Sequence, residues 1–233
     1  MVQEVPGGGM ISFGMCVSLG HATRLLPTSD SARVATVLSC LCGIIRDASR
    51  PPLSAVGACI ACGALLSRIG CDDDCGTAAN ALALLCETAF GCDKDAMRMN
   101  GAWLGLALAA HMPVRSAPAR VALRALLDRA YNFACERSSA RAACPAWLAI
   151  GSLTVACVVA DIMCVPDAKD VIVHGTACLE WDEFCCIALP GMLSDFAVCD
   201  TRRACIAVAC NGCGNRRVFL GLISAVLATF LRA

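Results

Sequence analysis

The sequence predicts an all-α protein, either a compact helical bundle around a central apolar helix or an irregular helical repeat array. Apolar residues make up 58% of the 233-residue chain, and charged residues divide them into blocks of about helix length. These blocks are 34–45, 51–67, 99–114, 142–160 and 218–231. The sequence contains no clear hairpin with alternating flanks, so a sheet protein is not expected. A chain of this length can bury a large core.

The first half of the chain carries the signals of successive helices after a flexible start at 1–9. Asp30 offers an N-cap to an apolar-periodic segment, and the Pro51-Pro52 pair begins another helix because proline fits a first helical turn. Met112-Pro113 ends the last helix of this half. The helices are expected at 32–47, from Pro51 to about Arg68, at 77–90 and at 93–111.

The second half begins with the clearest helical period of the chain. After Pro118, apolar side chains from Val121 to Ala134 fall on one helical stripe, with the charged residues elsewhere. The most apolar helix follows at 146–163. Shorter helices are expected at 176–187, 192–198 and 201–210. We therefore expect one all-α domain over 10–214, followed by an apolar tail at 215–233.

Composition excludes some classes of protein. The formal net charge is zero, so the basic footprint of a nucleic-acid binder is missing. The 17 arginines against two lysines indicate the base composition of a GC-rich genome and not selection for phosphate binding. Twenty residues are cysteines. Several of them lie inside apolar blocks, where a free thiol packs as a small hydrophobe: Cys40, Cys42, Cys59, Cys62 and Cys157. We expect the cysteines to be mostly reduced and buried in a cytosolic protein.

Patterns typical of catalysis or metal binding are few. The Cys59-Ile60-Ala61-Cys62 segment has redox spacing, but it lies in the middle of an apolar helix, where a thiolate is not favoured. Cys210 and Cys213 form a second CxxC on a turn, without the second pair that a structural zinc site needs. The three histidines form no dyad, and no phosphate-binding loop or nucleophile elbow occurs. The sequence therefore predicts no enzyme, no metal and no cofactor.

Two apolar segments raise the question of a membrane. Residues 142–160 form an uncharged run of 19, which fits either a spanning helix or the central helix of a bundle. Residues 218–231 form an uncharged run of 14 between arginines, which fits a tail anchor or a terminal helix docked on the core. The residues of the predicted anchor are Arg216, Arg217, Val218, Phe219, Leu220 and Leu231.

The tail from Asn215 to Gly221, with its arginines before the apolar run, resembles the tail anchors of the Bcl family of apoptosis regulators. In that family the central apolar helix begins with Asn-Trp-Gly-Arg. Here Ala146-Trp147-Leu148-Ala149 keeps only the tryptophan. The family's Leu-x-x-x-Gly-Asp element is approximated at 66–72, one residue out of register. The resemblance covers about 40 residues. It implies a groove against the 146–163 helix that binds an amphipathic helix of a partner through Trp147, Leu148, Leu153 and Val155.

Together these features predict a non-enzymatic protein–protein interaction module. It is expected in the cytoplasm, held by its tail on the cytosolic face of a mitochondrial or endoplasmic reticulum membrane. The resemblance implies a viral-type regulator of host cell death, whose partner is a host or cellular protein and not a nucleic acid. Two alternatives remain open: a soluble helical-repeat scaffold of the armadillo or HEAT type, and a polytopic membrane protein.

Overall fold

The computed structural model describes residues 8–27, 30–69, 76–91, 95–114, 116–136 and 140–163, together with residue 171. Within these residues there are seven α-helices and no strand, which confirms the all-α prediction. Contacts divide the chain into two compact units, residues 1–119 and 120–233.

The N-terminal unit contains five complete helices. The four helices predicted for this part are present within a few residues of their expected ends, and α1 begins at Gly8, inside the segment expected to be flexible. Asp30 occupies the N-cap position of α2, although its side chain accepts no capping hydrogen bond there. The helices are α1 (Gly8–Arg24), α2 (Ser31–Arg46), α3 (Pro52–Ile69), α4 (Thr77–Phe90) and α5 (Ala96–Ala109).

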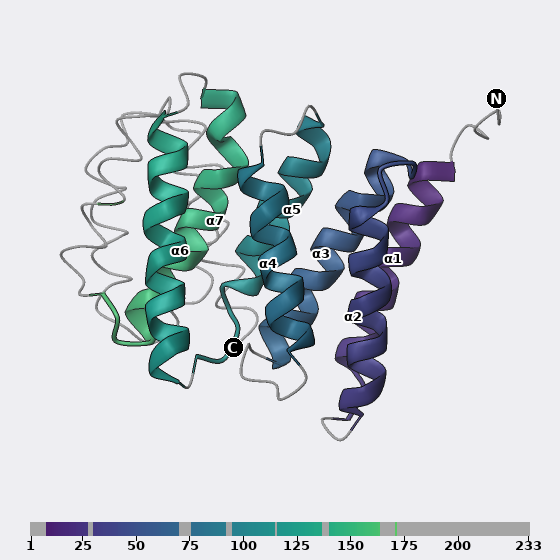
Figure 1. Ribbon diagram of the computed structural model, residues 1–233, viewed down its shortest axis with the longest axis horizontal. Helices are drawn as coiled ribbons and strands as arrows, with labels where there is room; N and C mark the ends of the chain where they lie inside the picture. Colours follow the sequence, from purple (N-terminus) through teal and green to yellow (C-terminus); the bar gives the residue numbers. More distant parts are fainter. Residues whose placement is uncertain are drawn as a thin grey trace, which may run out of the picture. The chain divides into compact units, whose positions relative to one another are not determined.

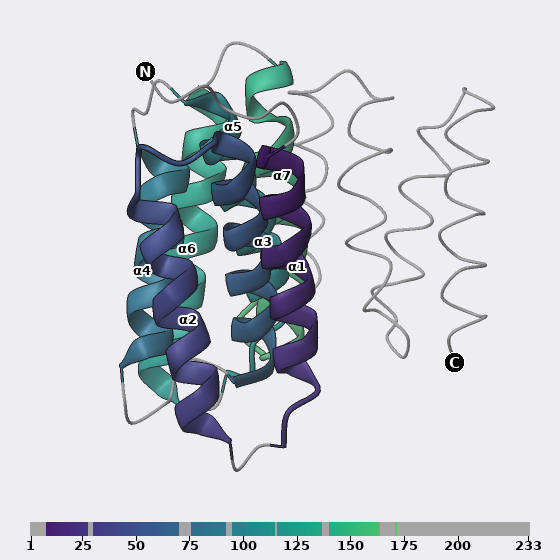
Figure 2. The same cartoon turned by 90° about the vertical axis from the view of Figure 1, so that its right-hand side faces the viewer.

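The central helix of this unit is α3, which contacts α1, α2, α4 and α5 (Figures 1 and 2). Twelve of its 18 residues are buried, on all sides of the helix. A helix surrounded by others must be apolar all round, because no face meets water. The N-terminal unit therefore forms around residues 52–69. The prediction that 146–163 is a central helix concerns the C-terminal unit and stays a prediction.

The outer helix α2 shows the complementary pattern. Its buried residues recur every three or four positions and so form a single stripe, while its opposite side carries exposed polar residues. One apolar stripe buries one face only, so α2 lies at the edge of the unit beside α3 (Figure 2). The stripe consists of Val34, Leu38, Leu41, Cys42 and Ile45.

Small residues bring the backbones of α1, α3 and α5 into direct contact. A Cβ atom added to Gly63 of α3 would lie 2.1 Å from the carbonyl oxygen of Gly105 in α5. One added to Gly57 of α3 would lie 2.8 Å from the carbonyl oxygen of Phe13 in α1. Only glycine fits so close an approach of two helices, as at the crossing points of helices with small-residue motifs. The extensive α1–α3 and α3–α5 interfaces depend on these positions.

The C-terminal unit contains the greater part of α6 (Ala117–Glu136) and α7 (Ala140–Val159). The buried residues of α6 are Leu123, Leu127, Ala130 and Ala134, all within the predicted stripe. Tyr131 of α6 meets Trp147 of α7 edge to face, with ring centroids 6.0 Å apart. The predicted helices after residue 175 lie outside the described residues.

Candidate functional site

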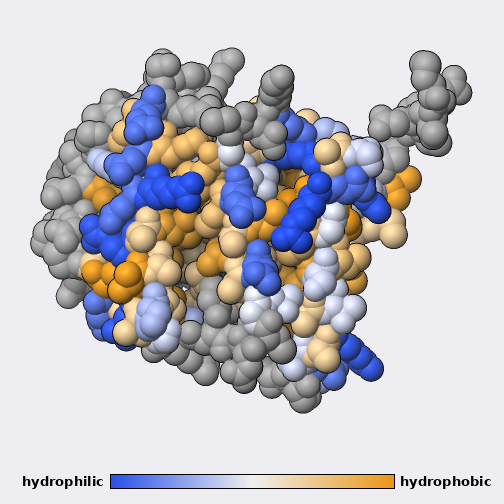
Figure 3. Space-filling view, viewed as in Figure 1, coloured by the Kyte–Doolittle hydropathy of each residue, from blue (hydrophilic) through white to orange (hydrophobic). Residues whose placement is uncertain are grey.

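The outer side of α1 carries exposed apolar side chains. Met10, Ile11 and Met15 are 62%, 67% and 68% exposed, and Leu19 is 40% exposed. We call these four residues the α1 apolar face. Figure 3 shows apolar surface at the outer edge of α1. Elsewhere in the described residues, exposed large apolar side chains are scattered singly along the chain.

The α1 apolar face continues into a hollow between α1 and α2, with a volume of about 380 Å³. Leu19 belongs both to the α1 apolar face and to the lining of the hollow. Arg33 is the only charged residue of the lining, and it pairs with Asp30 at 3.4 Å. The hollow is therefore apolar with one arginine in its lining. The lining of this α1–α2 hollow is Leu19, Ala22, Thr23, Leu26, Arg33, Thr36 and Val37.

An arginine of the central helix holds the end of α1 beside this hollow. Arg68, in the last turn of α3, donates hydrogen bonds to the carbonyl oxygens of Thr23 (3.2 Å), Arg24 and Leu26. The last carbonyls of a helix have no partner within the helix, and a cation there also complements the helix dipole. Arg68 thus fixes the chain that closes the hollow.

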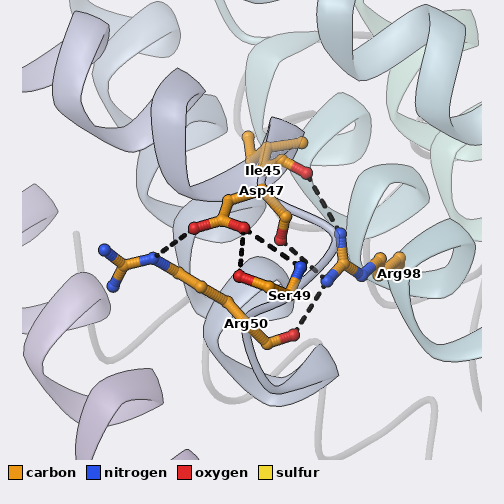
Figure 4. A network of polar contacts seen from close by, with 5 residues as sticks. All are labelled: Ile45, Asp47, Ser49, Arg50 and Arg98. Atoms are coloured by element: carbon orange, nitrogen blue, oxygen red, sulfur yellow. Dashed lines mark hydrogen bonds and ion pairs between the residues drawn. The ribbon is translucent and has the colours of Figure 1, made fainter.

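A second arginine holds the α2–α3 connection (Figure 4). Arg98, in the first turn of α5, is buried and donates to the carbonyl oxygens of Ile45 (3.3 Å), Asp47 (3.1 Å) and Arg50 (2.9 Å). Its charge is balanced by Asp95 at 3.0 Å. Asp95 also caps α5 by accepting from the backbone amides of its first turn.

The Asp47 side chain completes this network on its exposed side. It accepts hydrogen bonds from the Ser49 hydroxyl (2.6 Å) and amide (3.0 Å), and from Arg50 Nε at 3.2 Å. These bonds, that of the Ser49 hydroxyl first, lower the pKa of Asp47. Each residue of this network stabilises a turn or the end of a helix. The network therefore supports the fold and offers no surface to a ligand.

The sequence reasoning missed both arginines, because it attributed arginine enrichment to base composition. The sequence did contain a signal for both arginines, because each is an isolated charge in a long apolar segment. Arg68 is the only charged residue between 51 and 71, and Arg98 is the only one between 96 and 114. A single charge in an apolar helix is costly unless the fold supplies partners. Such isolated charges therefore indicate contacts to another element.

Four buried thiols gather where α1, α2 and α3 meet: Cys16, Cys42, Cys59 and Cys62. The Cys62 thiol is the largest influence on the pKa of Cys42, and the Cys42 thiol is the largest influence on the pKa of Cys62. The structure thus adds Cys42 of the neighbouring helix to the Cys59 and Cys62 that share a CxxC in the sequence.

The pKa values of the clustered thiols differ. Interaction with the Cys62 thiol lowers the pKa of Cys42 to about 7, against the effect of burial and with a smaller contribution from Arg46. Interaction with the Cys42 thiol raises the pKa of Cys62, and burial raises it further. Burial raises the pKa of Cys59 to about 12. In the described part of the chain, no group of three or more metal-ligating residues is placed to hold a metal ion.

The residues predicted to bind a partner lie on α7. Trp147 is 2% exposed and Leu153 is 0% exposed, so a partner that contacts them must first displace the chain that covers them. The side chains of Leu148 and Val155 lie outside the described part of the structure. Their role in binding stays a prediction. The anchor residues from Arg216 to Leu231 and the pair Cys210 and Cys213 also lie outside the described residues.

Among the described helices, α3 is the one long and apolar enough to cross a membrane, judged by length and composition. About two thirds of it is buried among other helices, and the core helix of a soluble bundle has the same properties. No protein-family model, curated protein or solved structure matches the chain. Its function has to be inferred from the geometry of the described residues.

Proposed function

We propose that this protein is a non-enzymatic interaction module that binds an amphipathic helix of a partner protein on the α1 apolar face and in the α1–α2 hollow. The observation that supports this most directly is the exposure of Met10, Ile11 and Met15 next to an apolar hollow. Large apolar side chains that gather on one side of a helix leave water only when another surface covers them. Methionine is suited to such a surface because its flexible side chain adapts to the partner.

The form and charge of the surface favour a helix with acidic flanks. A hollow between two helices matches the width of a third helix, whose apolar positions at i, i+3, i+4 and i+7 fill it. Arg33 of α2 lies in the lining, where it pairs with Asp30 at 3.4 Å. An acidic side chain beside the apolar stripe of the partner would pair with Arg33, which favours the correct orientation and speeds association.

The polar groups of the hollow support a binding role over catalysis. The hydroxyl of Thr23 donates to the carbonyl oxygen of Leu19 at 2.7 Å, and that of Thr36 donates to Ala32 at 2.9 Å. Arg33 pairs with Asp30 at 3.4 Å. Both hydroxyls are therefore bonded to carbonyl oxygens of their own helices. The lining supplies no general base to activate a nucleophile.

The test uses the full chain with methyl-labelled methionine and two synthetic helical peptides of equal composition. One peptide has an apolar stripe flanked by glutamates, and the other has the same residues in scrambled order. We expect the patterned peptide to shift the methyl signals of Met10 and Met15. The buried methyl groups of Met99 and Met112 should stay in place. Equal responses to both peptides, or shifts confined to the buried methionines, would refute the proposal.

A matched pair of variants locates the binding surface. Met15→Gln should weaken binding of the patterned peptide about tenfold, because truncating a central apolar contact costs on the order of 1.4 kcal/mol. Met97→Gln makes the same change at an exposed methionine of α5 and should leave the affinity unchanged. Methyl shifts that depend on protein concentration without peptide would instead indicate self-association.

The finer predictions rest on the sequence. Regulation of host cell death and residence on a mitochondrial or endoplasmic reticulum membrane follow from the resemblance of the tail and of the helix around Trp147. Deletion of residues 216–233 tests the anchor, since a tail-anchored protein then leaves the membrane fraction. A soluble scaffold never enters that fraction, and a polytopic protein stays in it after the deletion.

A further inference from the structure

We infer that Met10 and Met15 are modification sites at which hydrogen peroxide forms methionine sulfoxide, and that this oxidation releases the partner helix from the α1 apolar face. Release of the partner rests on the proposed function, whereas oxidation of the two side chains can be measured without any partner. The interaction surface thereby becomes sensitive to oxidants.

Exposure separates these two methionines from the others in the described part of the chain. Met10 and Met15 are 62% and 68% exposed, and Met97 of α5 is 47% exposed. Peroxide must reach the thioether sulfur, and the polar sulfoxide that forms must stay in water, so burial suppresses the reaction. The fold thus directs the oxidant to α1 first. The buried methionines are Met99, Met112 and Met163.

The two methionines make up half of the α1 apolar face. Met15 lies one helical turn from Ile11 on one side and from Leu19 on the other, because residues four apart are neighbours on a helix surface. Met10 lies beside Ile11 at the start of the helix. Isoleucine and leucine contain no sulfur and do not react with peroxide. Because both methionine side chains lie largely in water, their oxidation leaves the contact of α1 with α3 intact.

The oxidation is balanced. The thioether sulfur attacks one oxygen of hydrogen peroxide, the O–O bond breaks, the S–O bond forms, and the released hydroxide takes the remaining proton to give water. The sulfur loses two electrons, which the peroxide gains. A dithiol reverses the change when methionine sulfoxide reductases catalyse the reaction: the sulfoxide oxygen leaves as water, and the dithiol becomes a disulfide.

The sulfoxide weakens binding because a partner helix must displace water from the whole face. The apolar stripe of the partner offers no hydrogen-bond donor to the sulfoxide oxygen, and burial of an unpaired polar group is costly. The surface also loses the flexible apolar side chains that adapt to a partner. We expect oxidation to lower the affinity for the patterned peptide at least about tenfold, which is the effect expected of Met15→Gln.

Peptide mapping of the full-length protein after graded treatment with hydrogen peroxide tests the modification sites without a partner. Trypsin releases Met10 and Met15 on one peptide, 1–24, and leaves Met97 and the buried Met99 on separate peptides. Fragment ions locate each added oxygen. We expect sulfoxide first at Met10 and Met15, then at Met97, and last at Met99. Oxidation of Met99 as fast as that of Met10 and Met15 would overturn the assigned sites.

Binding of the patterned peptide to the same oxidised samples tests the release. The double variant Met10→Leu, Met15→Leu keeps an apolar face without a reactive sulfur, so its affinity should not change on oxidation. Met97→Leu is the matched control and should lose affinity as the wild type does. The comparison also separates methionine oxidation from thiol oxidation, since all three proteins have the same cysteines. Reductases with dithiothreitol should restore binding by the oxidised wild type.

Two results would overturn the release of the partner. One is unchanged affinity of the wild type after complete oxidation of Met10 and Met15. The other is a loss of affinity in the double variant as large as that in the wild type. Failure of the untreated wild type to bind the peptide would refute the proposed function and the release together, whereas the order of oxidation found by mapping is decided separately.

Discussion

Replacement of Gly63 by alanine is expected to destabilise the N-terminal unit by about 2 kcal/mol or more. The added Cβ atom would lie 2.1 Å from the carbonyl oxygen of Gly105, whereas ordinary contact begins at 3.4 Å. The difference, 3.4 minus 2.1, is a deficit of about 1.3 Å. A backbone carbonyl cannot rotate away as a side chain can, so α3 and α5 must separate locally.

The magnitude follows from what that separation does to the α3–α5 interface, one of the two most extensive in the unit. A gap of 0.5–1 Å already forfeits roughly a quarter to a half of the dispersion energy of the contacts it opens. Overpacking of a close-packed core costs about 1–3 kcal/mol, and more where backbones collide. Alanine recovers at most about 1 kcal/mol through its better helix propensity. The cost of overpacking therefore exceeds the gain in helix propensity.

Gly43→Ala is the matched control. Gly43 is also in the interior of a helix, but it is exposed, and nothing lies within 4 Å of an added Cβ atom. Here only the propensity term acts, and we expect stabilisation by about 0.5–1 kcal/mol. The same chemical change should thus have opposite signs at two helical glycines, because only one of them lies at a crossing of backbones.

Urea unfolding followed by far-ultraviolet circular dichroism measures both variants. Because the chain contains two compact units, a single transition is not guaranteed. Hydrogen exchange of peptides from α3 and α5 therefore reports on the affected unit directly. We expect faster exchange of these peptides in Gly63→Ala and slower or unchanged exchange in Gly43→Ala. If Gly63→Ala matches or exceeds the wild-type stability, the close approach of α3 and α5 is wrong.

Three further outcomes are expected. Arg98→Met should lower the free energy of unfolding in urea by about 2–4 kcal/mol, because it leaves three backbone carbonyl oxygens and the Asp95 carboxylate without their partner. Arg124→Ala is the control. It removes an exposed ion pair on α6 and should lower that free energy by about 0.5 kcal/mol or less. Burial raises the pKa of Cys59 to about 12 and that of Cys157 to about 11 from the ordinary 9.0. Above pH 9 the unfolded chain therefore loses protons that the folded chain keeps. The free energy of unfolding, measured with urea, should fall between pH 9 and about 12, by roughly 1 kcal/mol per thiol at pH 10. Alkylation of Cys42 in the folded protein should rise with pH around a midpoint near 7, as its lowered pKa requires; a midpoint near 9 would contradict the lowered pKa.

The candidate sites show why the chemistry was harder to predict than the helices. Nothing in the sequence indicated a reactive thiol at Cys59 or Cys62, because their CxxC lies in the middle of an apolar helix. The strongest influence on the pKa of Cys62 comes from Cys42, 20 positions earlier in the chain, and no spacing rule connects the two. The same holds for Arg98, whose acceptors are carbonyl oxygens about 50 residues away. Contacts between elements depend on how helices cross, which local patterns do not specify.

Local patterns were sufficient for the helices from α2 to α6, whereas no helix was predicted where α1 lies. Charges and prolines mark the ends of the predicted helices, and the single apolar stripe of α2 indicates which face of that helix is buried. Both features depend on residues that are close in sequence, because the hydrogen bonds of a helix and the burial of one of its faces involve neighbouring turns. The packing around α3 was not local. Segment 52–69 is apolar on all sides, and that pattern does not say which helices cover it. Glycines at 57, 63 and 105 let backbones meet around α3, and that fit between surfaces exists only once the helices have packed.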